Sequence, residues 1–390
     1  MIDSFSILPN QRALFDIPDD VAYLNCAYMS PLLNAVAAAG EAAVRQKQHP
    51  WEITPPDFFT VPDLGRELFA RIIGASREDI AIVPAVSYGM AVAAINIQVG
   101  AGQEILVLED QFPSNIYPWM EKAKSSGGRL VILPRTSSPG DSGKQETWAS
   151  RILEAIGAQT AIVALPQCHW IDGSLIDLAT VGKAARKVGA ALVLDLTQSA
   201  GAMPVDVQEI QPDYLVAASY KWLLGPYSLG FLYIAPQRQG GQPLEHGWAG
   251  RKGAEDFSRL VDYQEAPAPG VRRFDMGERS QFHLMPMAVT AMQQILDWGV
   301  AAIAATLARK TRDIAECVGQ LGLVSVPENL RAGHYLGLRF PAGMPKDIHQ
   351  QLARHHVHVS IRGDSMRVTP HLYNTDSDTN RLFEALETVL

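Results

Sequence analysis

A lysine follows directly on an apolar run in the middle of the chain. Residues 214–219 are typical of a buried strand, Lys221 comes next, and Gly225-Pro226 predicts a turn before a second apolar run at 229–234. A lysine amine attacks a carbonyl carbon only when its pKa is lowered, and partial burial lowers it by disfavouring the ammonium form. Lys221 is therefore a candidate for a Schiff-base link to a carbonyl compound, although most lysines near strand ends are solvated surface residues.

An aspartate ends another apolar run upstream of this lysine. Asp195 follows residues 191–194, and in open α/β sheets the ligand crevice lies beyond the carboxyl ends of the strands. A carboxylate there could pair with the protonated ring nitrogen of pyridoxal phosphate, which needs such a partner to act as an electron sink. The alternative is an ordinary helix cap. The stretch between Asp195 and Lys221 is long enough for one further βα excursion, which would bring both residues to the same edge of a sheet.

The segments around Asp195, Gln198 and Lys221 resemble those of the class V aminotransferase family of pyridoxal-phosphate enzymes. The resemblance covers nearly the whole chain, from Tyr23-Leu24-Asn25 to residues 367–375. It implies an α/β protein of PLP-dependent transferase fold type I (aspartate aminotransferase-like), with a mostly parallel seven-stranded sheet in a large domain and a smaller α+β C-terminal domain. It also implies pyridoxal 5'-phosphate as cofactor and a homodimer with a shared active site.

Two branches of the family resemble the chain most. Residues 112–115, 219–221 and 247–248 are similar to kynureninase, and the second branch is the isopenicillin-N-epimerase-like one. The kynureninase motif usually ends in aspartate where this chain has Asn115, and kynureninases tend to have histidine where this chain has Gln198. The motifs therefore leave the branch open.

Composition narrows the class of protein further. A chain of 390 residues with 47% hydrophobic content can bury a large core and usually divides into more than one domain. The net charge of -8 argues against a nucleic-acid partner. The three cysteines form no close-spaced pair, so we expect neither a disulfide framework nor a cysteine zinc site, and a reducing cytoplasm is the natural setting. No secretory leader or membrane span is expected, since no apolar stretch reaches the roughly 18 residues that a span needs.

Apolar runs alternate with helical stretches in the first two thirds of the chain, which is the βα rhythm of a parallel sheet. After residue 237 the alternation of apolar runs and helical stretches ends, and a long alanine-rich helical region is expected from 287 to about 321. We predict an N-terminal arm at 1–20, a large cofactor-binding domain at 21–265 and a small α+β domain at 266–390. The strands expected are 80–83, 105–108, 130–133, 161–165, 191–194, 335–340, 357–361 and 366–369.

A phosphate group needs backbone donors at a helix N-terminus, which residues 85–91 can supply. Ser87 is the expected side-chain ligand, flanked by Val86 and Tyr88, and its alternative role is an ordinary N-cap. In the resembling family this turn holds the cofactor phosphate. Tyr220 matches the kynureninase position that also reaches the phosphate.

Three side chains are expected to meet the cofactor ring. The resemblance gives Phe112 a stacking role, which is worth about 0.5 to 1.5 kcal/mol beyond burial. It places Gln198 near the phenolic oxygen, where a neutral donor tunes the Schiff-base pKa, and Trp170 beside the same oxygen. His169 could serve as an acid or base, or as a structural hydrogen bonder.

The substrate's α-carboxylate calls for a planar bidentate donor, which arginine supplies. Arg367 is the candidate, because its segment resembles the one in kynureninase whose arginine grips the amino-acid carboxylate; Arg362 is either a second contact or a surface partner. Arg367 also stands where one class of cysteine desulfurase carries its persulfide cysteine, so desulfuration by that route is disfavoured. Asn25 and Tyr28 match a family strand that lines the substrate entrance, and could equally be packing residues.

Trp248 and residues 277–280 resemble loops that reach across the dimer interface to complete the partner's site. The family often has threonine where this chain has Glu278, and the alternative is an ordinary surface loop.

The reaction expected from these residues is proton transfer at the α-carbon of an amino acid, with transamination as the leading interpretation. A C–S or C–C lyase or an epimerase of the kynureninase or isopenicillin-N-epimerase-like type is the alternative. A cofactor-free relative of the fold is disfavoured by the joint presence of Asp195, Gln198 and Lys221. A nicotinamide dehydrogenase is excluded because no G-x-G-x-x-G follows the first strand.

Overall fold

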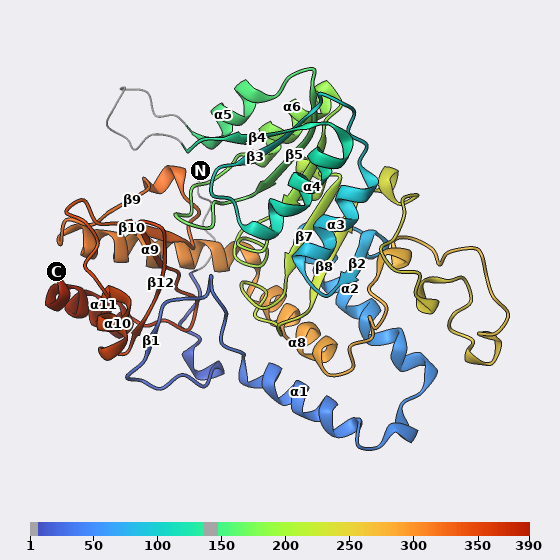
Figure 1. Cartoon of the computed structure of the whole chain (residues 1–390). Helices are drawn as coiled ribbons and strands as arrows, with labels where there is room; N and C mark the ends of the chain where they lie inside the picture. Colours follow the sequence, from blue (N-terminus) through green and yellow to red (C-terminus); the bar gives the residue numbers. More distant parts are fainter. Residues whose placement is uncertain (1–6, 136–146) are drawn as a thin grey trace.

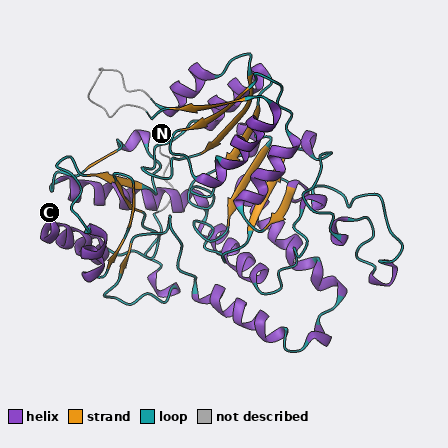
Figure 2. Ribbon diagram, viewed as in Figure 1, coloured by secondary structure: helices purple, strands orange, loops and turns teal. Residues whose placement is uncertain are grey.

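A seven-stranded sheet forms the centre of the protein (Figures 1 and 2). This computed structural model describes residues 7–135 and 147–390, so that residues 1–6 of the predicted arm lie outside it. The strand order is β2-β8-β7-β6-β5-β3-β4, and β8 runs antiparallel to both its neighbours while the other pairs are parallel. The predicted fold class is thereby confirmed. The strands are β2 Ile80–Val83, β3 Glu104–Leu108, β4 Arg129–Leu133, β5 Thr160–Pro166, β6 Ala191–Asp195, β7 Tyr214–Ala218 and β8 Gly230–Ile234.

Helices cover both faces of this sheet, as its near-continuous apolar strands require. Alternate strand residues enter different cores: Leu106 and Leu194 pack with helices α2, α5, α6 and α8, whereas Val107 and Val193 pack with α3 and α4 on the opposite face. A short helix, α7 Val207–Ile210, precedes β7. The covering helices are α2 Thr60–Ile73, α3 Val86–Asn96, α4 Tyr117–Ser126, α5 Trp148–Ala155, α6 Leu178–Val188 and α8 Leu284–Trp298.

The C-terminal region builds a second, antiparallel sheet with a core of its own. Its strand order is β12-β13-β10-β9, and Ile314, Leu352 and Leu382 belong to the apolar cluster that covers it. This confirms the smaller α+β part expected from the sequence. Its elements are α9 Val300–Gly319, β9 Val324–Ser325, β10 Leu336–Arg339, α10 Ile348–Arg354, β12 Ser360–Arg362, β13 Ser365–Val368 and α11 Asp376–Val389.

Two expected elements are divided in the structure. The helical region predicted from 287 breaks at Gly299, whose φ of 79° ends α8 before α9 begins. The strand predicted at 357–361 splits at Val359: β11 Val357–His358 pairs with β1 Ala22–Tyr23, while β12 joins the antiparallel sheet. The sequence pattern did not reveal either division, because the residues on both sides of each break are apolar.

The N-terminal segment lies against the C-terminal sheet. Beyond the β1–β11 pair, Asn25 bridges to Thr369 in parallel register, and helix α1 Asn34–Gln46 then packs on α8. Helix α8 in turn packs on α2 and contributes to the core of the central sheet. The domain boundary at 265/266 therefore stays a prediction.

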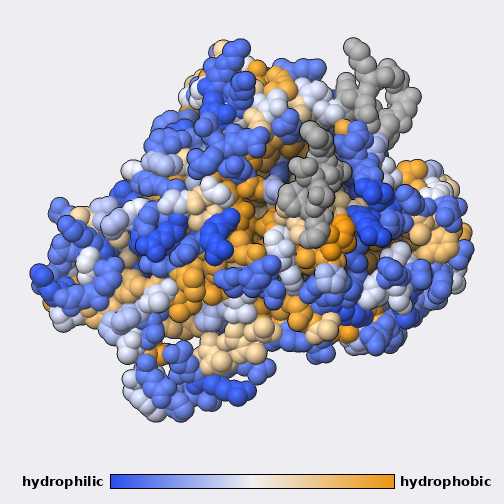
Figure 3. Space-filling view, turned by 180° about the vertical axis from the view of Figure 1, so that it is seen from behind, coloured by the Kyte–Doolittle hydropathy of each residue, from blue (hydrophilic) through white to orange (hydrophobic). Residues whose placement is uncertain are grey.

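The hydropathy of the surface varies across the face that is turned away in Figure 1. Figure 3 shows apolar side chains gathered in the middle of that face, with hydrophilic ones around them. A contiguous apolar area on a protein surface is typical of an interaction site. Of the helices within residues 7–135 and 147–390, none is both long and apolar enough to cross a membrane.

Candidate active site at the carboxyl edge of the central sheet

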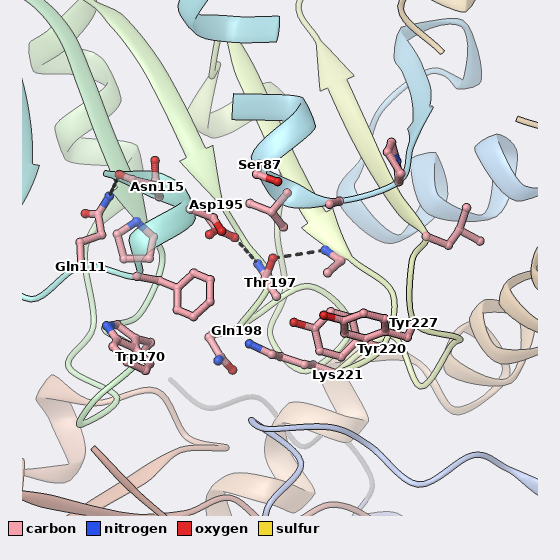
Figure 4. A pocket seen from close by; sticks show the side chains of 18 of the residues that line it. Ser87, Gln111, Asn115, Trp170, Asp195, Thr197, Gln198, Tyr220, Lys221 and Tyr227 are labelled. Carbon is pink, nitrogen blue, oxygen red and sulfur yellow. Dashed lines mark hydrogen bonds between the residues drawn. The ribbon is translucent and has the colours of Figure 1, made fainter. Parts of the chain in front are cut away.

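A cavity of about 260 Å³ opens where the parallel strands end (Figure 4). Asp195 is the last residue of β6, Lys221 follows β7, and the segments after β2, β3 and β5 supply the rest of the wall. This is where open α/β sheets bind ligands. The cavity is lined by Pro84, Ala85, Val86, Ser87, Gln111, Phe112, Ser114, Asn115, Pro166, Cys168, Trp170, Asp195, Thr197, Gln198, Ala218, Tyr220, Lys221, Tyr227, Ser228 and Leu229.

Lys221 is almost completely buried, with 6% of its surface exposed. Burial lowers its pKa to about 8; the carboxylate of Asp195 opposes this shift, while the guanidinium groups of Arg367 and Arg362 add to it. The amine nitrogen lies 5.4 Å from the ring centre of Phe112 and 5.6 Å from that of Tyr220. A lysine in this setting supplies a free amine near neutral pH, which is the requirement for attack on a carbonyl.

The turn that carries Lys221 is tightly fixed. The Ser219 hydroxyl donates to the carbonyl oxygens of Pro226 and Leu229, and the backbone N–H of Gly225 donates to the Ser219 carbonyl at 2.8 Å. Leu224 adopts a φ of 53°, a conformation that only a well-constrained turn imposes on a leucine. Lys221 therefore stands on a rigid loop.

Asp195 has 7% of its surface exposed and does not cap a helix. Its Oδ1 accepts the backbone N–H of Thr197 at 3.0 Å, and the Thr197 hydroxyl accepts the N–H of Ala218 at 3.2 Å. Burial raises the pKa of Asp195, whereas the hydrogen bonds from Thr197 and the charge of Lys221 lower it. A cationic ligand nitrogen beside Asp195 would favour its ionised form further.

The N-terminus of α3 faces the cavity without a side-chain cap. Ala85, not Ser87, is the N-cap residue and its side chain makes no capping hydrogen bond, so the first backbone N–H groups of the helix have no intrahelical partner. Val86 and Ser87 line the cavity as predicted, whereas Tyr88 packs between the two apolar cores and is absent from the cavity wall. This end of the cavity suits an anion.

The aromatic residues predicted to meet the cofactor ring lie together. The rings of Phe112 and Trp170 meet edge to face at 5.3 Å, and both line the cavity. The Trp170 indole donates to the Asp110 carbonyl. Burial raises the pKa of Tyr220 to about 12, so that its hydroxyl remains a donor throughout the physiological pH range.

Gln198 is held by hydrogen bonds at both ends of its amide. Its Nε2 donates to the Ala27 carbonyl at 3.1 Å, and its Oε1 accepts the indole N–H of Trp222 at 3.0 Å. The Gln198 backbone carbonyl accepts from Nε2 of His334 at 2.6 Å. In Figure 4 the Gln198 side chain lies between Trp170 and Lys221.

Arg367 lies behind Trp170, outside the cavity wall itself. It is 1% exposed, its Nε donates to the Ser360 hydroxyl at 2.8 Å, and its Nη1 donates to the Trp170 carbonyl at 3.2 Å. The guanidinium carbons of Arg367 and Arg362 stand 5.7 and 5.8 Å from the Trp170 ring. Two guanidinium groups thus flank one side chain of the cavity.

The remaining predicted residues do not line the cavity of their own chain. Asn25 is buried with its Oδ1 unpaired, and Tyr28 is 53% exposed. Trp248 is 39% exposed and packs with Phe58, Phe59 and Phe257. The roles of these three residues in substrate or cofactor binding remain predictions.

His169 is structural in this arrangement. It is fully buried, stacks on Trp148 at 5.6 Å, and its Nε2 lies 3.1 Å from the Glu109 carbonyl. Burial lowers its pKa. The interpretation as an acid or base is therefore not supported by its position.

Sequence reasoning missed several residues of the wall. Thr197 was overlooked although it stands two residues after Asp195, the spacing of an Asx-type turn. Asn115 was noted only as a departure from a motif, yet its Oδ1 accepts the indole N–H of Trp119 at 2.9 Å, and its buried Nδ2 has no partner among the described residues. Tyr227, whose ring centre is 4.5 Å from that of Tyr220, carried no sequence signal.

The model of the family described as aminotransferase class V matches residues 60–377. The chain belongs to this family. The expected family is thereby confirmed, and with it the expected cofactor, pyridoxal 5'-phosphate. The cavity fits that group: a buried amine of lowered pKa can meet its aldehyde, an uncapped helix N-terminus its phosphate, and a buried carboxylate its ring nitrogen.

Curated relatives include several activities. The chain is 25% identical to the uncharacterized aminotransferase YcbU of Bacillus subtilis, over 83% of this chain and 82% of that protein. It is 25% identical to the kynureninase of Myxococcus xanthus (92% and 85%) and 24% identical to the isopenicillin N epimerase of Amycolatopsis lactamdurans (97% of each). These relatives agree with the two branches that the motifs indicated.

Solved structures share the fold at low identity. The apo cysteine desulfurase of Thermococcus onnurineus superposes with a TM-score of 0.82 at 20% identity, over 97% of each chain. A mutant of C-DES with glycine covalently linked to the PLP cofactor reaches 0.86 at 20% identity, over 97% of this chain and all of that chain. Both are similar in fold type I architecture.

Proposed function

We propose that the protein is a pyridoxal-phosphate enzyme that acts on an amino acid through a Schiff base at Lys221, and that its reaction is transamination. The observation that carries the proposal is the buried Lys221 amine, whose pKa is lowered to about 8 beside the carboxylate of Asp195. When bound, the cofactor supplies the electron sink that stabilises negative charge at the substrate α-carbon.

Lys221 is the base in this proposal. The Lys221 amine, when it is not linked to the cofactor, would be unprotonated in a substantial fraction near pH 8, so it could take the α-proton and return one. The hydrogen bonds of its turn would limit how far the Lys221 backbone can move during the proton transfer. Asp195 would keep a proton on the ring nitrogen, because its buried carboxylate would gain a charged partner there.

Arg367 orients the substrate. Its guanidinium is fixed by Ser360 and by the Trp170 carbonyl, which leaves it pre-organised to pair with an α-carboxylate. Holding the carboxylate determines which bond at the α-carbon stands perpendicular to the ring. Val86 and Ser87 on α3 and Tyr220 after β7 would hold the phosphate, with Tyr88 next to Ser87 on the same helix turn, and Phe112 and Trp170 would enclose the ring. The predicted substrate contacts Asn25 and Tyr28 belong to the N-terminal segment.

Cysteine desulfuration remains disfavoured. Cys26 and Cys168 are fully buried and burial raises the pKa of both thiols, which keeps them protonated and unreactive. Cys317 lies on α9. The short hairpin between β12 and β13 carries no cysteine.

A homodimer that shares its active sites is part of the proposal. Trp248 packs in an aromatic cluster outside its own cavity and is partly exposed, which agrees with a role in a partner's site. The apolar area in Figure 3 could be covered by a second copy of the chain. The three free cysteines agree with a reducing cytoplasm as the location.

The cofactor link is tested by absorbance. Purified protein supplied with pyridoxal phosphate should show the visible band of a lysine-linked pyridoxal, and Lys221→Ala should lose it. Lys310→Ala is the matched control, because Lys310 also has a lowered pKa but donates to the Asn374 carbonyl away from the cavity. A colourless wild-type protein would refute the proposal.

The reaction is tested by product analysis with a panel of amino acids. Transamination predicts that a keto acid forms only when a second keto acid is present as amino acceptor. Pyruvate or alanine formed without an acceptor would instead identify a lyase of the kynureninase type, and inversion at the α-carbon would identify an epimerase.

A further inference from the structure

Gln198 lines the cavity, and its amide is held by hydrogen bonds at both its oxygen and its nitrogen. The indole of Trp222 can only donate and the carbonyl of Ala27 can only accept. Trp222 therefore binds Oε1 at 3.0 Å and Ala27 binds one hydrogen of Nε2 at 3.1 Å. In the opposite orientation of the amide, the Nε2 hydrogens would face the indole N–H of Trp222, and Oε1 would face the carbonyl oxygen of Ala27.

Nε2 carries two hydrogens, so this arrangement leaves its second N–H without a partner among the residues that the structure describes, and the Gln198 side chain lines the cavity. We infer that Trp222 is a positioning residue, whose indole compels Gln198 to present a hydrogen-bond donor, and not its carbonyl oxygen, to the bound cofactor. The inference rests on the proposed function, because it concerns the ring oxygen expected beside Gln198. Trp222 itself does not line the cavity.

The position of Trp222 is fixed from several sides. Its side chain is fully buried and its ring meets that of His334 edge to face at 4.3 Å. Gly201 approaches its backbone so closely, at a φ of 94°, that a Cβ atom there would lie 2.5 Å from the Trp222 carbonyl oxygen. The indole therefore has little freedom to turn away from Gln198.

His334 fixes the main chain of the same residue. Its Nε2 must carry a proton, since it lies 2.6 Å from the Gln198 carbonyl oxygen, which can only accept. Burial lowers the pKa of His334 to about 4, so the ring stays neutral and this contact does not change with pH above that range. His334 precedes β10, which means that the C-terminal region helps to hold Gln198.

The predicted consequence is spectroscopic. A donor on the ring oxygen withdraws negative charge that would otherwise stabilise the protonated lysine link, so losing the donor raises the pKa of that link. One hydrogen bond that differs between two protonation states corresponds to a shift of about 0.5 to 1 pH unit. Among the described residues, the charged or titratable groups that face Lys221 are Cys26, Cys168, Asp195, Tyr220, Arg362 and Arg367, and Trp222 substitution removes none of them.

The experiment titrates the visible absorbance of the cofactor-loaded protein against pH. Trp222→Phe should raise the midpoint by about 0.5 to 1 pH unit. Trp148→Phe, which removes a buried indole that stacks on His169 instead, should leave it unchanged. If Trp222→Phe folds poorly, benzothienylalanine at position 222 replaces the N–H by sulfur with almost no change of shape, and the same shift is expected.

A double-mutant comparison separates this role from a general structural one. Gln198→Ala should raise the midpoint, and adding Trp222→Phe to Gln198→Ala should cause no further shift, because the indole acts through Gln198. Equal midpoints in wild type and both position-222 variants, or additive shifts in the double variant, would overturn the inference alone. A wild-type protein without the visible band would overturn the proposed function and this inference together.

Discussion

Lys221 is expected to destabilise the cofactor-free protein, and removing its charge should stabilise it. Its pKa is about 8 in the folded protein, well below the 10.5 of a free lysine, so the folded state disfavours the ammonium form. The difference of about 2.5 pH units corresponds to roughly 3 kcal/mol at pH 7. Between these two pKa values the unfolded chain binds more protons than the folded one, so stability rises with pH there.

The measurement is urea unfolding of the apo protein for wild type and Lys221→Met. Lys221→Met should be more stable at pH 7, and its advantage should fall by about 2 kcal/mol between pH 7 and pH 9.5 as wild-type Lys221 loses its proton. Methionine also adds a constant packing contribution, which does not depend on pH. A stability difference that stays constant over this range would refute the reasoning that burial holds the pKa of Lys221 down.

Three further outcomes are expected. Arg367→Ala should weaken amino-acid binding by about 2 to 5 kcal/mol, measured by spectral titration of the holoenzyme, and unchanged binding would remove Arg367 from the site. Ser87→Ala should weaken pyridoxal-phosphate binding by about 1 kcal/mol in equilibrium dialysis, whereas equal affinities would exclude a hydroxyl contact with the phosphate. Asp275→Ala should lower the free energy of unfolding by about 3 to 5 kcal/mol, because it leaves the buried guanidinium groups of Arg66 and Arg279 without their shared carboxylate; a drop under about 1 kcal/mol in urea unfolding would contradict this.

The sequence predicted the central sheet well because its strands are apolar on both faces and polar residues mark their ends. Asp195 and Lys221 were found for this reason: each stands where an apolar run stops, and parallel strands bring such ends to one edge. The family resemblance then predicted which residues accompany these two at the cofactor, and those binding roles stay predictions. Ser87, Phe112 and Gln198 lie in the cavity wall as expected.

Other features depend on turn geometry, which apolar pattern does not encode. Trp222 reads as a core residue in the sequence, and its hydrogen bond to Gln198 arises only because the turn after β7 brings the two together. Tyr88 was expected at the cofactor, but the helical rotation of α3 places it in the packing layer. The division between α8 and α9 at Gly299 depends on the positive φ of this glycine, which the sequence does not show.

The pairing of β1 with β11 and the bridge from Asn25 to Thr369 have a consequence for biosynthesis. A nascent chain emerges from its N-terminus, yet the backbone N–H groups of Ala22, Leu24 and Cys26 find their acceptors in His356, His358 and Thr369. Ala27, which holds the amide of Gln198, belongs to this N-terminal segment, which is fixed only once its C-terminal partners are available. The central sheet can therefore form while translation continues, but the cavity reaches its final shape only after nearly the whole chain has left the ribosome.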